Sequence, residues 1–86
     1  MLKVSEAVRS THSQDGAIVL DIQQGRMFNL NLVGSRILEL LEAGTAESLI
    51  ADEISREFGV SSDVVNQDMH DFINALEEHR LVEELN

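Results

Sequence analysis

The side chains of this 86-residue chain that could do chemistry are three histidines and sixteen carboxylates, and their spacing assembles no recognisable site. His12, His70 and His79 form no His-x-x-x-His pair, and the nine positions from His70 to His79 place these two on different faces of one predicted helix. The chain has no cysteine, so it offers neither a thiolate metal ligand nor a thiol nucleophile. No spacing joins a nucleophile to a base and an orienting group. We therefore expect a protein that is not an enzyme, with no catalytic residue, no metal site and no cofactor.

One serine leaves a second kind of chemistry open. The segment Glu47–Leu49 begins a predicted helix and resembles the Asp-Ser-Leu motif of acyl carrier proteins, which are also small and acidic. Ser48 would then be the attachment site for phosphopantetheine in an acyl or peptidyl carrier protein. The pattern differs from that of carriers because the helix is too short, strands replace the long first helix, and only one long helix follows. The carrier function is the alternative hypothesis.

The charge of the chain disfavours two classes of partner. Six basic residues stand against sixteen acidic ones, which gives a formal net charge of −10. Such a surface repels the phosphates of nucleic acids and of anionic lipids, so we expect no nucleic-acid partner and no membrane partner. No apolar run approaches the roughly 20 residues that span a bilayer, and residues 1–3 begin no apolar secretion signal. We expect a cytoplasmic protein.

The elements that must position any site change character once along the chain, near residue 31. Before it, three short segments have the β-branched or alternating pattern of strands, at residues 7–12, 17–22 and 27–30. After it, apolar residues recur every three or four positions, which predicts three helices. The expected helix boundaries, N-cap included, are Asn31 to Ala43, Thr45 to Phe58, and Ser61 or Ser62 to His79.

These elements predict one α+β domain over residues 1–86, in the order β-β-β-α-α-α. A three-stranded antiparallel β-meander is followed by three α-helices that pack on it, which is a winged-helix-like arrangement. In a simple meander the strand at residues 27–30 is an edge strand. It carries neither charge nor proline, so its free N–H and C=O groups can pair with an extended peptide in a groove beside the third helix.

A longer pattern, covering about residues 8–83, resembles the PqqD family, the small proteins of pyrroloquinoline quinone (PQQ) biosynthesis and their relatives. The residues that carry the resemblance are Val19-Leu20-Asp21, Gly25-Arg26-Met27-Phe28-Asn29-Leu30-Asn31, Gly34, Ile37-Leu38, Leu40-Leu41, Phe58-Gly59-Val60, Asp68, Phe72, Leu76 and Leu81-Val82. The chain departs from the family where Leu38 replaces a frequent aromatic residue and where Arg80 replaces a frequent glycine. Both departures concern packing and leave the implied binding function untouched.

The resemblance implies a non-catalytic peptide chaperone that recognises precursors of ribosomally synthesised and post-translationally modified peptides (RiPPs). Such a protein binds the leader segment of the precursor by strand addition and presents it to a modifying enzyme, such as a radical SAM protein or a leader protease. Carried over to this chain, main-chain pairing falls to Met27, Phe28, Asn29 and Leu30. The third-helix residues expected to line the groove are Val64, Gln67, His70, Asp71 and Asn74. Quinone-cofactor and lasso-peptide pathways use similar modules, so the pathway stays open.

Overall fold

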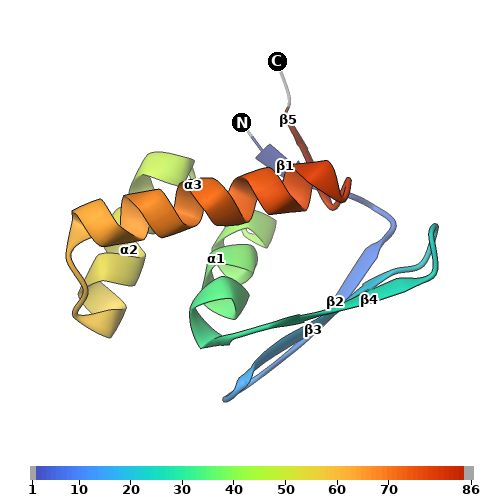
Figure 1. The fold of residues 1–86 in the computed structure, drawn as a ribbon, viewed down its shortest axis with the longest axis horizontal. Helices are drawn as coiled ribbons and strands as arrows, with labels where there is room; N and C mark the ends of the chain where they lie inside the picture. The colour runs from blue at the N-terminus through green and yellow to red at the C-terminus, as the bar shows by residue number, and fades with distance from the viewer. Residues whose placement is uncertain (1, 85–86) are drawn as a thin grey trace.

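The structure is a computed structural model that describes residues 2–84; residues 1, 85 and 86 of the expected domain lie outside the described residues. In this part of the chain, α1 lies on the meander of three strands, α2 packs on α1, and α3 packs on α2 (Figure 1). The elements in chain order are β1 (Leu2–Val4), β2 (Val8–Ser13), β3 (Gly16–Asp21), β4 (Arg26–Leu30), α1 (Leu32–Glu42), α2 (Glu47–Phe58), α3 (Ser62–Glu78) and β5 (Val82–Glu84).

The predicted antiparallel meander is confirmed, with the strands in the spatial order β2-β3-β4. Val19, in the central strand, pairs with Ser10 of β2 on one side and with Phe28 of β4 on the other. Val19 is buried, whereas the next residue, Leu20, is exposed. This alternation is the one a strand requires when only one face of its sheet covers a core.

Two further strands correct the predicted element order. β1 pairs with β5, with Leu2 opposite Glu84 and Val4 opposite Val82, in a separate two-stranded antiparallel sheet. The prediction of a single meander followed by three helices is therefore wrong about the number of strands and sheets. The α+β class with three helices and antiparallel sheets is confirmed, and the winged-helix description stays a prediction. β1 and β5 were not predicted because a strand of three residues is too short to show an alternating pattern. Their pairing also joins segments from nearly opposite ends of the sequence, which no local pattern reveals.

The helix caps agree with the sequence at two of the three helices. The side-chain oxygen of Asn31 accepts a hydrogen bond from the Gly34 amide at 2.8 Å, and Ser61 caps α3 in the same way. The prediction of Thr45 as a cap is wrong, because α2 begins after Ala46, which makes no side-chain cap bond. The Thr45 amide instead donates to a carbonyl in the last turn of α1, so Thr45 belongs to the end of that helix. Among residues 2–84, no helix has the length and apolar character needed to cross a membrane.

The core lies between the meander and the helices. Its fully buried large side chains are Leu38, Ile50, Ile54 and Val19. Leu81 and Val82, beyond the third helix, are 3% and 4% exposed, which places these two residues in the same core. Each such side chain stabilises the fold by about 1.5–3 kcal/mol when fully buried, so aliphatic burial accounts for a domain with few aromatic residues.

Arg26 ties β4 to the C-terminal end of α3. Its Nη2 donates to the carbonyl oxygen of His79 at 2.9 Å and lies 3.5 Å from the carboxylate of Asp21. The guanidinium carbon lies 5.4 Å from the ring centroid of Phe28, on which the imidazole of His79 also packs. Asp21 is buried, and its other oxygen accepts two amides of the following turn. The Arg26 side chain therefore contacts a buried carboxylate, the carbonyl at a helix end and an aromatic ring.

Arg36 and Glu57 form a contrasting ion pair between α1 and α2. The Nε of Arg36 donates to both carboxylate oxygens of Glu57, at 3.0 and 2.9 Å, and both side chains are about one third exposed. The hydrogen bond from Arg36, together with its charge, lowers the pKa of Glu57 from its usual value. The stabilisation from this pair is therefore present above the unfolded-state pKa of Glu57 and is lost as the pH falls through the lower folded-state pKa.

We predict that Arg26→Met lowers the free energy of unfolding by about 2–4 kcal/mol, because it leaves Asp21 buried without its cation and removes the bond to the end of α3. Arg36→Met, which also removes one arginine from an ion pair, is expected to cost less than about 1 kcal/mol because that pair is exposed. Urea unfolding at neutral pH measures both values. Equal losses for the two variants would contradict the role assigned to Arg26.

Candidate functional site

β4 leaves one edge of the meander unpaired. The Ile22 amide donates to the Ala7 carbonyl at 3.0 Å, which fixes the alternation of the antiparallel ladder. Even-numbered residues of β3 then bond to β2, and odd-numbered residues bond to β4. On β4, Phe28 bonds inward, whereas the N–H and C=O groups of Met27 and Asn29 point to the free edge. Of the four residues predicted to pair with a peptide, Met27 and Asn29 therefore point to the free edge, whereas Phe28 and Leu30 bond to β3.

The side chains of β4 alternate in the same register. Phe28 and Leu30 are half-buried and pack against the core beneath the helices. Met27 is 62% exposed, and Asn29 is also exposed, because both lie on the opposite face of the sheet. The edge thus combines outward hydrogen-bonding groups with an apolar surface on its helix side.

One flank of α3 faces β4 and forms a second wall. A side chain added at Gly34 would lie 3.3 Å from the ring of Phe72, so α1 and α3 cross closely at this point. At the C-terminal end of α3, the imidazole of His79 packs on Phe28, with 5.0 Å between the ring centroids. The exposed Ala75 lies between them, three residues after Phe72 and four before His79, on the same flank. One contact past the middle of α3 and one at its C-terminal end therefore hold this flank in place.

A cavity of about 340 Å³ lies between α3 and the start of α1, beside Asn31, the residue that follows β4. Its lining residues are Asn31, Val33, Gly34, Ile37, Asp68, Asp71 and Phe72. Asp68 and Asp71 are exposed, and within residues 2–84 neither carboxylate has a hydrogen-bond or ion-pair partner. The cavity therefore combines apolar side chains with two unpaired negative charges.

The residues predicted to line the groove from the third helix do not lie together. Asp71 lines the cavity beside the end of β4. His70 and Asn74 lie on another flank of α3, where the Asn74 amide nitrogen is 3.3 Å from the His70 imidazole, and they line a different cavity that includes Ser48. Val64 is half-exposed at the start of α3.

Gln67 is exposed and lines neither of these two cavities. Asp68 and Phe72, which line the cavity, and His79, which contacts β4, were not predicted as site residues from the sequence. Their spacing of four and seven positions was the signal that could have grouped them on one helical flank.

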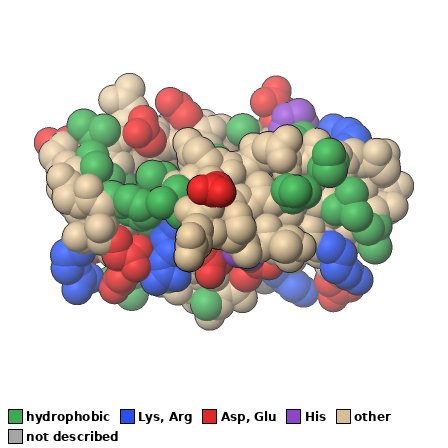
Figure 2. Space-filling model, turned by 90° about the horizontal axis from the view of Figure 1, so that it is seen from below, with side chains coloured by type: hydrophobic (Ala, Val, Ile, Leu, Met, Phe, Trp, Pro, Cys, Tyr) green, Lys and Arg blue, Asp and Glu red, His purple; other side chains and the backbone are tan. Residues whose placement is uncertain are grey.

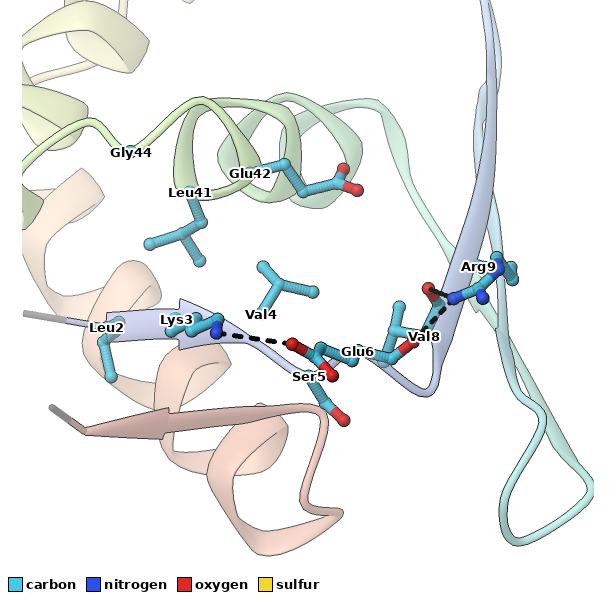
Figure 3. A pocket seen from close by; sticks show the side chains of 10 residues that line it. All are labelled: Leu2, Lys3, Val4, Ser5, Glu6, Val8, Arg9, Leu41, Glu42 and Gly44. Carbon is cyan, nitrogen blue, oxygen red and sulfur yellow. Dashed lines mark hydrogen bonds and ion pairs between the residues drawn. The ribbon is translucent and has the colours of Figure 1, made fainter.

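Another cavity lies elsewhere and has a different character. It measures about 470 Å³ between β1, the turn to β2 and the end of α1, where Val4 and Leu41 face it (Figure 3). Charged side chains that line it already have partners within the cavity wall. Lys3 lies 3.7 Å from the Glu6 carboxylate, and Arg9 donates a hydrogen bond to the Glu6 carbonyl. Residues of β1 and β2, each at the edge of its own sheet, line it, but no residue of β4 or α3 does, so it lies apart from the β4 edge.

A Ser-His-Glu cluster joins β2 to α1. His12 Nδ1 lies 2.7 Å from Ser35 Oγ, and His12 Nε2 lies 3.2 Å from Glu42 Oε1. Ser35 is only 2% exposed, so a substrate has no access to its hydroxyl. The cluster therefore fastens a strand to a helix. Within residues 2–84, no group of three or more histidine, aspartate or glutamate side chains is arranged to hold a metal ion.

The outer face of the meander carries exposed apolar side chains, visible in green on the right of Figure 2. They are Ile18, Leu20, Ile22 and Met27, each between 42% and 62% exposed. They lie on the face opposite the helices, so a strand added at the edge of β4 would leave them uncovered.

Comparisons with known proteins agree with this geometry. The family model for coenzyme PQQ synthesis protein D (PqqD) matches residues 16–82. The solved structure of TbiB1 in complex with the TbiA(beta) leader peptide is 40% identical, with a TM-score of 0.89 over 98% of each chain. Among proteins with curated descriptions, none matches the chain.

A second solved structure shares the fold. Lasso peptide synthetase B1, complexed with the leader peptide, has a TM-score of 0.85 and 18% identity, and the match covers 96% of this chain and 98% of that one. None of these findings supports the carrier alternative at Ser48. The matched residues include β3, β4 and all three helices, which are the elements that form the edge and the wall facing it. The chain belongs to the PqqD family.

Proposed function

We propose that this protein binds the leader segment of a ribosomally synthesised precursor peptide and presents it to a modifying enzyme, without itself catalysing a reaction. The leader adds as a strand to the free edge of β4 and packs against the facing flank of α3. The observation that carries the proposal is the open edge, where the N–H and C=O groups of Met27 and Asn29 lack a partner strand. TbiB1, 40% identical to this chain, is described in complex with a leader peptide, which supports the same ligand class here.

Both the edge and the apolar surface are needed for affinity. Ordering each backbone residue of a free peptide costs about 1–2 kcal/mol. Each of the four outward groups of Met27 and Asn29 returns only about 0.5–1.5 kcal/mol net as a hydrogen bond. Apolar leader side chains must supply the remainder, at about 1.5–3 kcal/mol each when fully buried. The half-buried Phe28, Leu30 and Phe72 offer the surface on which they pack.

The modifying enzyme, such as a radical SAM protein or a leader protease, contacts the outer face of the meander in the complex of this protein with the leader. The apolar face with Ile18, Leu20, Ile22 and Met27 stays uncovered after strand addition and adjoins the leader site through Met27. Exposed apolar sets of this kind favour protein contacts. The net charge of −10 favours a basic leader or a basic enzyme surface, as an interaction that weakens with salt.

We predict that Asn29→Pro weakens leader binding about 10- to 100-fold, because it removes an outward N–H, leaves a peptide carbonyl unpaired and spares the bonds of β4 to β3. Fluorescence polarisation with a labelled TbiA(beta) leader peptide measures the affinity. Asn29→Ala is the matched control and should bind within about twofold of the wild type, since an exposed side chain is lost and the N–H is kept. A Pro variant that melts normally and binds as tightly as the wild type would rule out pairing at this edge.

Hydrogen exchange followed by NMR gives a second test. In the free protein, the amides of Phe28 and Leu30 are expected to exchange slowly because they bond to β3, and those of Met27 and Asn29 to exchange fast. Addition of the TbiA(beta) leader peptide is expected to slow exchange at Met27 and Asn29 by about tenfold or more. Unchanged exchange at both residues under saturating peptide would exclude strand addition to β4.

A further inference from the structure

We propose that the cavity at the end of β4 selects a leader side chain with an aliphatic stem and a positively charged end, which is a lysine or an arginine. The inference rests on the proposed function and names the chemistry of one position in the leader. It concerns the cavity lined by Val33, Ile37 and Phe72 together with Asp68 and Asp71.

The position of the cavity makes it part of the leader path. Asn31 lines it and directly follows Leu30, the last residue of β4. A peptide paired along β4 advances about 3.3 Å per residue, so a chain that continues past Asn29 reaches the cavity within a few residues. The amide of Gly34 already occupies the side-chain oxygen of Asn31 at 2.8 Å, so this cap cannot turn away to fill the space without losing its bond.

The walls of the cavity suit an aliphatic stem. Ile37 is 2% exposed, and Val33 and Phe72 are half-buried. Phe72 packs where Gly34 leaves room, since a Cβ at Gly34 would lie 3.3 Å from the ring. Methylene groups laid against these side chains would leave water in the way that the stems of lysine and arginine do on apolar surfaces.

The two carboxylates determine the sign of the charge. Asp68 and Asp71 are three positions apart on α3, so their side chains lie on neighbouring parts of one flank. Within residues 2–84 neither has a partner, and α3 contains no lysine or arginine that could supply one. An uncharged apolar side chain would strip water from these carboxylates without replacing it, and an acidic side chain would be repelled. A cation satisfies both and forms charge-assisted hydrogen bonds.

The test is a positional scan of the TbiA(beta) leader peptide, in which each position in turn carries Lys, Arg, Met or Glu. On the wild-type protein, one position is expected to favour Lys or Arg over Met by about tenfold in affinity, and to disfavour Glu. The double variant Asp68→Asn with Asp71→Asn is expected to lose this preference. Asp52→Asn with Asp63→Asn changes the net charge equally at exposed sites that line neither the cavity nor β4, and should keep it.

A charge exchange sharpens the test. Asp71→Lys is expected to reverse the preference at the same leader position, so that Glu binds better than Lys. A preference for Lys or Arg that persists in the double Asn variant, or its absence from every position on the wild type, overturns the inference. If the peptides still slow exchange at Met27 and Asn29 in that case, only the inference fails. If they leave those amides unchanged, the proposed function fails with it.

Discussion

Backbone N–H and C=O groups require hydrogen-bond partners. At the outer edge of β4 these groups have no partner strand and can bond only to water until another strand pairs with them. Natural edge strands are commonly blunted by charge or by proline, yet β4 has neither along Met27–Leu30. Arg26 stands at its start, but the guanidinium turns toward His79 and Asp21. The cation that could have protected the edge instead positions the helix facing it.

The distance between β4 and α3 depends on contacts along the C-terminal half of the helix. At the C-terminal end, Arg26 and Phe28 contact His79, and further along α3 Phe72 packs against Gly34. Between these contacts the half-buried apolar side chains of β4 are not fully covered. A wall fixed in this way need not move to admit a strand, which reduces the cost of ordering the site on binding. The family pattern of glycine, arginine and phenylalanine around β4 therefore has a structural explanation in this chain.

The strands and helices near the site could be predicted from sequence because their signals are local. Alternation defined β3 and β4, and the capping chemistry of Asn31 and Ser61 marked two helix starts. The sheet of β1 and β5 could not be predicted, since its pairing joins Leu2 to Glu84 and short strands carry no period. The wall residues of α3 were only partly predicted. The residues that flank the buried apolar face of α3 include Asp71 on one side and His70 and Asn74 on the other. Periodicity identifies both sides but cannot tell which of them faces β4.

The excess of acidic residues in the chain is also found locally, on the helix that lines the site. Ser62–Glu78 contains no basic residue, and two of its carboxylates line the cavity where β4 ends. A strand pairing through backbone groups alone would accept many sequences, because those groups are the same in every residue. Side-chain cavities and charge are therefore the features through which such an edge can distinguish one leader from another.

The pairing of β1 with β5 brings residues 2 and 84 side by side, in a sheet separate from the meander. In Figure 1 this small sheet lies at the top of the view, whereas β4 lies below. The β1–β5 sheet pairs with no strand of the meander, so it takes up none of the outward N–H and C=O groups of β4.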